Sequence, residues 1–124
     1  MPQTIYTSHA PKAIGPYSQA IKTNDLIFCS GQIPLRPDGT IVEGDIKEQT
    51  KQVMENLKAV LEAANSNLDK IVKTTIYLTD LNDFQAVNEI YGSYFKQNFP
   101  ARATVQVTAL PKGAKIEIEV IATL

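Results

Sequence analysis

The stretch FPARATVQVTALPKGAKIEIEVIATL, residues 99–124, ends the chain with two runs in which side chains alternate in polarity. A period of two residues is typical of a β-strand, so we expect strands over 102–109 and 116–124, paired as an antiparallel hairpin. In the first run, Ala103, Val105, Val107 and Ala109 point one way, and Arg102, Thr104, Gln106 and Thr108 the other. In the second run, Ile116, Ile118, Val120, Ala122 and Leu124 oppose Glu117 and Glu119.

Composition narrows the class of protein. The 124 residues are 44% hydrophobic and 20% charged, which fits one globular domain, residues 1–124. The net charge is −1 with no basic run, which argues against nucleic-acid binding by phosphate neutralisation. One cysteine, Cys29, and one histidine, His9, cannot form an internal disulfide or a structural zinc site. No leader or membrane-length apolar run is present, so we expect a cytoplasmic protein.

Further strands are expected before the middle of the chain and between the helices. Asn24 and Asp25 tolerate the positive φ of a tight turn, which predicts a hairpin between 17–23 and 26–32. The other expected strands are a short edge strand at 3–7, a stub at 41–42 and a strand with buried β-branched residues at 69–80.

Two helices are expected, at 44–67 and 82–99, because apolar residues recur there at three- and four-residue spacing. Pro100 would end the second. Each begins with a capping pair, Asp45 with Glu48 and Asn82 with Gln85.

The order ββ(β)αβαββ predicts an α+β fold, a mixed sheet with both helices packed on one face. Helix-length connections predict parallel pairing of 26–32 with 69–80 and of 69–80 with 102–109. The helix-free face would carry small polar residues, so we expect a homo-oligomer whose sheets meet there, with ligand grooves between subunits. These face residues are Thr104, Gln106, Thr108 and Glu117.

Arg102 and Glu117 are the first candidates for chemistry. A guanidinium on a strand is rigidly aimed and binds a carboxylate through two parallel hydrogen bonds, although a plain surface arginine is the simpler interpretation. Glu117, on the adjacent hairpin strand, would stay ionised near Arg102 and position or deprotonate a water. The alternation leaves open whether Glu117 or Glu119 lies nearer the arginine.

Other polar residues lie where a binding site needs them. Asn88 falls on the apolar stripe of the second helix, where its amide needs a partner, either a backbone group or a ligand. Tyr17 offers a phenol, and Gly31, beside Ser30, permits close backbone approach. Cys29 points away from Ser30 and is interpreted as buried packing.

Six segments together resemble the RidA/YjgF family of reactive-intermediate (enamine/imine) deaminases over essentially the whole chain. They are HAPKAIGPYSQA, SGQIPL, QVMENLKAVLEAA, VNEIYGSYF, PARA and LPKGAKIEIEVIA. The resemblance implies a chorismate-mutase-like fold, a homotrimer with clefts between subunits, and neither metal nor organic cofactor. It implies hydrolysis of 2-imino and 2-enamino acids such as 2-aminoacrylate to 2-keto acids and ammonia, which protects pyridoxal-phosphate enzymes.

The resemblance also assigns residues to the cleft. Arg102 matches the carboxylate-binding arginine, Tyr17 the cleft tyrosine and Glu117 the water-associated glutamate. Ser30 and Gly31 match the family loop, and Phe84 and Asn88 match helix positions lining the cleft. One departure is Thr104, which stands where the family usually has cysteine; this change should tolerate activity while altering the shape of the pocket.

The main alternative is a non-catalytic protein that binds small 2-keto or carboxylic acids through Arg102 and signals to a partner. A surface interaction protein or holdase would be insensitive to Arg102. RNA cleavage, attached to some family members, has little physical support in the charge balance and the single histidine, His9.

Overall fold

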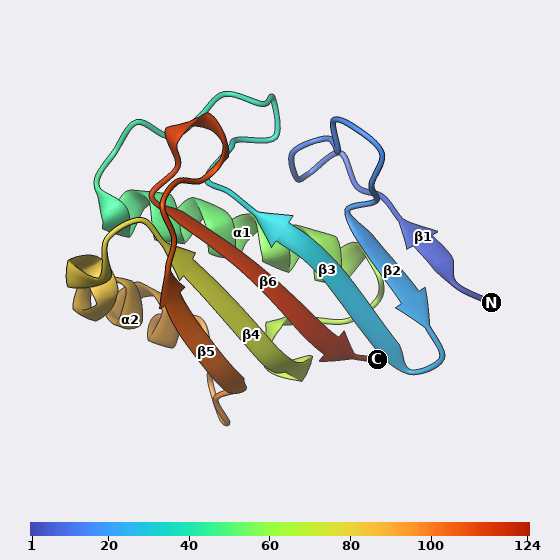
Figure 1. Cartoon of the computed structure of the whole chain (residues 1–124). Helices are drawn as coiled ribbons and strands as arrows, with labels where there is room; N and C mark the ends of the chain where they lie inside the picture. Colours follow the sequence, from blue (N-terminus) through green and yellow to red (C-terminus); the bar gives the residue numbers. More distant parts are fainter.

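The computed structural model describes residues 1–124 as one six-stranded sheet with two α-helices. Figure 1 shows the strands in the spatial order β1-β2-β3-β6-β4-β5. Along the chain the elements are β1 (Gln3–Ile5), β2 (Ala20–Thr23), β3 (Leu26–Gln32), α1 (Ile46–Ala63), β4 (Ile71–Leu78), α2 (Phe84–Ser93), β5 (Ala101–Gln106) and β6 (Ile116–Thr123).

The pairing differs from the sequence prediction at the centre of the sheet. β4 and β5 are parallel, as predicted, but β3 and β4 are not neighbours. β6 lies between them and runs antiparallel to both. The predicted hairpin of β5 with β6 is therefore wrong, because the chain after β5 crosses the end of β4 before β6 begins. Val107 N donates to Leu78 O at that crossing, and Thr79 N donates to Lys115 O.

The first hairpin follows the prediction. β2 and β3 are antiparallel, and Asn24 in their turn has a φ of 52°. β1 is an edge strand paired with β2, and the stub at 41–42 is a single bridge between Leu35 and Ile41.

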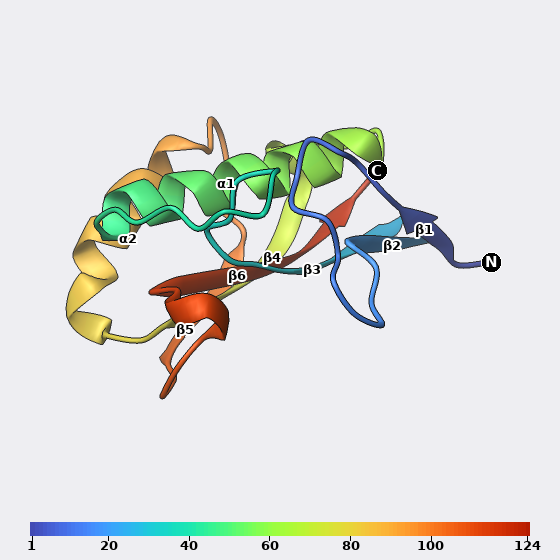
Figure 2. The same cartoon turned by 90° about the horizontal axis from the view of Figure 1, so that it is seen from above.

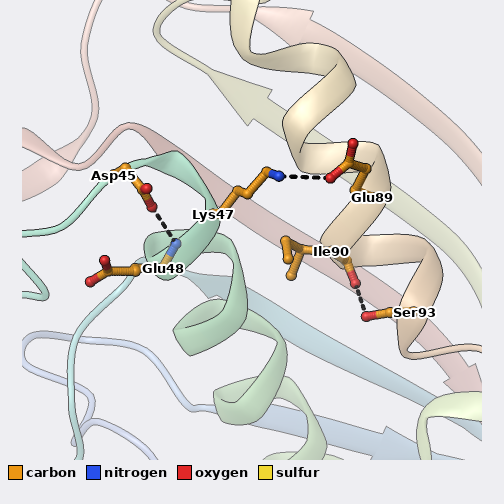
Figure 3. Close-up of polar contacts among 6 residues, drawn as sticks. All are labelled: Asp45, Lys47, Glu48, Glu89, Ile90 and Ser93. Atoms are coloured by element: carbon orange, nitrogen blue, oxygen red, sulfur yellow. Dashed lines mark hydrogen bonds and ion pairs between the residues drawn. The ribbon is translucent and has the colours of Figure 1, made fainter.

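Helix α1 was predicted at 44–67; it lies within that range but ends earlier, at Ala63, and it carries the core. Asp45 Oδ1 accepts a hydrogen bond from Glu48 N at 2.9 Å, which fixes the first turn (Figure 3). Asn65, with a φ of 61°, follows the helix in the left-handed conformation that ends many helices. Leu57 and Leu61 are among its fully buried residues.

Helix α2 is shorter than predicted, ending at Ser93 rather than near Pro100. Its last turn contains glycine and serine, which are weak helix formers, and Ser93 Oγ donates to Ile90 O at 2.6 Å (Figure 3). The predicted Asn82 and Gln85 cap is also wrong; a short 3₁₀ turn with Asp80 as its cap precedes the helix. An ion pair of 2.7 Å between Lys47 and Glu89 joins α1 to α2.

Both helices lie on one face of the sheet, as Figure 2 shows from above. The assignment of faces on β5 is the reverse of the prediction. Arg102 is directly opposite Thr74, which is fully buried under the helices, so Arg102 and Thr104 share the helix side. The helix-free face instead exposes apolar side chains, including Phe28 at 42% and Val105 at 42% exposure. Neither helix is long and apolar enough to cross a membrane.

Candidate active site

Helix α2 holds Arg102 through three side chains. Arg102 Nη1 donates a hydrogen bond to Asn88 Oδ1 at 2.7 Å. The guanidinium carbon lies 5.3 Å from the ring centroid of Phe84 and 5.2 Å from that of Tyr91. These contacts fix the guanidinium, while the neutral amide leaves its positive charge uncompensated and its other N–H groups free of protein acceptors.

A cavity of about 360 Å³ opens beside Arg102. Tyr91 forms part of its wall, and the Tyr91 hydroxyl donates to Thr74 Oγ1 at 3.0 Å. Burial raises the pKa of Tyr91, so the phenol stays neutral and anchored to the core. The other lining residues are Asn88, Gly92, Phe99 and Pro100. This cavity presents a single fixed cation between apolar surfaces, an arrangement suited to a small carboxylate.

A second cavity, of about 440 Å³, is lined by three segments that meet at the other end of the sheet. They are the loop with Lys12, Ile14 and Tyr17, the end of β3 with Gly31, and the turn with Lys112 that leads to Glu117. Tyr17 is 54% exposed, so its phenol tip is available to a ligand or a neighbouring molecule.

Glu117 lies half-buried in this second cavity, directly over Gly31. A Cβ atom on residue 31 would collide with Glu117 Oε2. Burial raises the pKa of Glu117, and the charge of Glu119 raises it further. The φ angle of Gly31 is not positive, so the glycine is needed here for the space that the carboxylate occupies.

Glu119 has a different partner. The Tyr77 hydroxyl donates a hydrogen bond to Glu119 Oε1 on the helix-free face, and this bond raises the pKa of Tyr77. Glu117 makes no such bond and lines the cavity, so geometry favours Glu117 over Glu119 as the group that meets a ligand.

Three residues considered in the sequence lie outside both cavities. Ser30 Oγ donates to Ser18 O at 2.6 Å, and this bond connects β3 to the loop that precedes β2. The Thr104 hydroxyl is buried without a hydrogen-bond partner and lies outside both cavities. Cys29 is buried, as predicted, and burial raises its pKa to about 12, so it stays an unreactive thiol.

Within one chain the predicted proximity of Arg102 and Glu117 is wrong. β4 separates their strands, and Arg102 is level with Thr74 whereas Glu117 is level with Tyr77. This offset places their backbones about 14 Å apart, with the side chains on opposite faces of the sheet. The candidate residues therefore lie in two separate groups, which we call half-sites. The Arg102 half-site contains Phe84 and Asn88, and the Glu117 half-site contains Tyr17 and Gly31.

Two contributors were missed in the sequence. Tyr91 was not singled out as a site residue, yet its ring packs against the Arg102 guanidinium. The spacing of Phe84, Asn88 and Tyr91 by four and three residues was the available signal, since it puts them on one helix face. Lys112, with a φ of 57°, could be placed only from the conformation of the turn.

Comparison with known proteins identifies the family. The chain matches the family model described as Endoribonuclease L-PSP over residues 7–124. A 2-iminobutanoate/2-iminopropanoate deaminase of Homo sapiens is 52% identical over 121 residues, which cover 97% of this chain and 88% of that protein. The chain belongs to the RidA/YjgF family.

Solved structures agree with the RidA/YjgF assignment. The crystal structure of a Rid-family protein from Yersinia pestis has a TM-score of 0.98 and 56% sequence identity, covering 100% of both chains. That of E. coli TdcF with bound serine has a TM-score of 0.94 and 41% identity, covering 98% of both chains. RidA/YjgF relatives thus carry both deaminase and endoribonuclease descriptions.

Proposed function

We propose that this protein hydrolyses reactive 2-imino acids, in equilibrium with 2-enamino acids such as 2-aminoacrylate, to 2-keto acids and ammonia. In the overall reaction, water adds its oxygen to the imine carbon, the C–N bond breaks and nitrogen leaves as ammonia. Removal of these electrophiles would protect pyridoxal-phosphate enzymes from damage. The name of the human relative, 2-iminobutanoate/2-iminopropanoate deaminase, supports this choice.

The observation that carries the proposal is the uncompensated charge of Arg102. Asn88 and two aromatic rings hold the guanidinium without neutralising it. Every 2-imino acid has a carboxylate next to its imine carbon, and a planar guanidinium binds a carboxylate through two parallel hydrogen bonds. The serine bound in the structure of TdcF also bears an α-carboxylate, which is consistent with a site of this chemistry in the family.

Glu117 would position the attacking water and act as its general base. The protonated imine carbon is already electrophilic, so orientation and charge placement suffice without a covalent intermediate. Glu117 takes one proton from the attacking water and passes it to the nitrogen. As the C–N bond breaks, the new hydroxyl group gives its remaining proton back to Glu117 or to solvent, and the carbonyl of the 2-keto acid forms. Burial raises the pKa of Glu117, which makes its carboxylate a stronger base than an exposed one.

The two half-sites would meet between copies of the chain. We expect the Arg102 half-site of one copy to face the Glu117 half-site of the next, in a homotrimer with three equivalent clefts. The exposed apolar side chains of the helix-free face, Phe28 and Val105 among them, support burial of that face against other copies. The number of three comes from the family resemblance.

A coupled assay tests this function. A pyridoxal-phosphate dehydratase generates 2-aminoacrylate from serine, and imine loss and pyruvate formation are followed with and without the purified protein. We expect the native chain to accelerate imine loss and Arg102→Ala to abolish the acceleration. The matched control is Arg36→Ala, which removes the only other arginine, an exposed one at a turn.

The outcomes separate the alternatives. Binding of 2-oxobutanoate through Arg102 without turnover would favour the non-catalytic binder. Full activity in Arg102→Ala would contradict the carboxylate role. RNA cleavage that persists in Arg102→Ala would show an activity that does not use the Arg102 cavity.

A further inference from the structure

The walls of the Glu117 cavity are largely irregular backbone. One wall begins where β3 ends and continues as an excursion over residues 33–45 before α1. Another is the turn at 110–115 that leads into β6. Backbone groups in such segments lack ladder partners, so each buried N–H or C=O needs a hydrogen bond from elsewhere.

Two amide side chains of α1 provide these bonds. Asn56 Nδ2 donates to Leu35 O at 2.8 Å and to Ile33 O at 3.4 Å, which fixes the start of the excursion. Gln49 Nε2 donates to Val42 O at 2.9 Å, which fixes its end.

Gln49 also reaches the second wall. Its Oε1 accepts a hydrogen bond from Lys115 N at 2.9 Å, two residues before Glu117. One side chain therefore ties the excursion to the strand that carries the carboxylate. Asn56 completes its own bonding by accepting from Gln52 Nε2 at 2.9 Å.

Asn56 and Gln49 are buried, unlike the polar residues that usually cover the exposed face of a helix. Asn56 is 1% exposed and Gln49 is 4% exposed. They are seven residues apart, two turns along one side of α1. Asparagine is a poor helix former, and a buried amide is unfavourable without partners, so an apolar residue would suit the helix itself better. The equally buried Thr50 differs, since its hydroxyl bonds only to Ile46 O within α1.

We propose that Asn56 and Gln49 are positioning residues that brace the Glu117 cavity from behind and so set the place of the carboxylate and the cavity wall. Neither is among the residues lining the cavity. The proposal rests on the proposed function for its kinetic consequence, whereas its structural consequence stands apart from activity. A third buried amide, Gln19, differs because it lines the cavity itself, and it donates to Pro11 O of the remaining wall at 2.9 Å.

The test compares Asn56→Leu, which keeps the branched heavy-atom skeleton, and Gln49→Met, which keeps the chain length, with Ser66→Ala. Both amide substitutions remove the donors. Ser66 is the matched control because its buried hydroxyl also bonds across elements, to Thr123 O at 2.6 Å. That bond lies at the other end of β6, about 20 Å from Glu117 along the strand. The readouts are imine turnover, the affinity for 2-oxobutanoate and backbone amide exchange of segments 31–36 and 110–117. The midpoint of denaturant unfolding is measured for every variant.

We expect Asn56→Leu and Gln49→Met to lower kcat/KM about tenfold or more, mainly through kcat, since a shift of about 1 Å in a catalytic group has effects of this size or larger. Exchange should accelerate in segments 31–36 and 110–117. Ser66→Ala should lower the unfolding midpoint comparably and leave turnover unchanged. Turnover within twofold of native in both amide variants would overturn the proposal, as would an equal loss in Ser66→Ala.

Failure of the proposed function would look different. A native protein that neither turns over imines nor binds 2-oxobutanoate would contradict the function, and the exchange measurement would then decide the bracing role. Faster exchange confined to the two segments supports it. Unchanged exchange there overturns it, even if a variant is less stable overall.

Discussion

Glu117 and Gly31 form a close-packed pair in which the Glu117 carboxylate occupies the space that a Cβ atom on residue 31 would need. Gly31→Ala must therefore move the carboxylate. We expect a loss of imine turnover of about two orders of magnitude, the size seen when a catalytic group shifts by about 1 Å. Because the clashing atoms belong to the end of a half-buried side chain that can move, the free energy of unfolding should fall by only about 1 kcal/mol, the low end of the range for overpacked sites.

A double-mutant comparison isolates this contact. In the Glu117→Ala background the side chain that clashes is gone, so Gly31→Ala should have little further effect on the free energy of unfolding. Denaturant unfolding of the four proteins gives the coupling. An equal destabilisation by Gly31→Ala in both backgrounds would mean that backbone strain, and not Glu117, requires the glycine.

The pairing of Arg102 with a neutral amide predicts a specific effect of Asn88→Asp. The new carboxylate would neutralise the guanidinium and compete with the ligand carboxylate. We expect the dissociation constant of 2-oxobutanoate to rise roughly tenfold or more. Calorimetric titration of purified protein measures this.

Asn88→Ala is the matched control for the charge. It removes the same hydrogen bond but keeps Arg102 uncompensated, so binding should weaken less than in Asn88→Asp. Equal weakening in the two variants would show that Asn88 acts by orienting the arginine, and that its neutrality has no part in binding.

The sequence predicted local features well and non-local ones poorly. The apolar stripe of α1 and its Asp45 N-cap follow from residues within a few positions of each other, and both were confirmed; the reciprocal bond from the Glu48 side chain is not formed. The alternation in 116–124 predicted a strand but not its neighbours, since period two is the same in a hairpin and in a central strand between β3 and β4. For the same reason, Arg102 and Glu117 were placed together on a hairpin that does not exist.

The candidate site shows the same division. Residue types pointed to Arg102 and Glu117, because a rigid arginine and a strand glutamate suggest definite chemistry. Their assignment to separate half-sites required the order of the strands and the faces of β5. The bracing role of Gln49 was also inaccessible, because its partners at Val42 and Lys115 are backbone groups of loops that carry no pattern.

The unpartnered hydroxyl of Thr104 predicts that Thr104→Val stabilises the fold. Valine has the same shape and removes a buried polar group that forms no hydrogen bond. We expect a gain of about 1 kcal/mol in the free energy of unfolding, measured with denaturant at fixed protein concentration. A loss of similar size would mean that the hydroxyl finds a partner in the assembled protein. Thr104→Ser, which keeps the hydroxyl, controls for the change in shape.

The raised pKa of Glu117 predicts a pH-dependent cost to stability. The folded chain holds the Glu117 proton more tightly than the unfolded chain. The contribution of Glu117 to stability is therefore fully present below its ordinary pKa of 4.5 and is lost as pH rises through the folded pKa. Glu117→Gln, which cannot ionise, should be more stable than native protein at neutral pH, and the difference should shrink under acid. Unfolding of both proteins across this range measures the effect. A constant difference would mean that ionisation of Glu117 has no part in it.

The separation of Arg102 and Glu117 predicts that two inactive variants restore activity when mixed. In a cleft shared by neighbouring copies, the Glu117→Ala chain supplies its arginine and the Arg102→Ala chain its glutamate. Random reassembly of equal amounts should give about a quarter of the clefts both native residues, and so about a quarter of native activity. Mixing after partial denaturation and refolding, with the mass of the assembly measured by light scattering, tests this.

The control is the double variant Arg102→Ala with Glu117→Ala on one chain, mixed with native protein. Here too about a quarter of the clefts keep both native residues, so recovery from the two single variants should match this mixture. If instead each cleft uses both residues from one chain, the single variants stay inactive together while the control mixture retains about half of native activity. If activity is recovered but the measured mass does not correspond to three chains, the shared cleft stands and the proposed trimer is wrong.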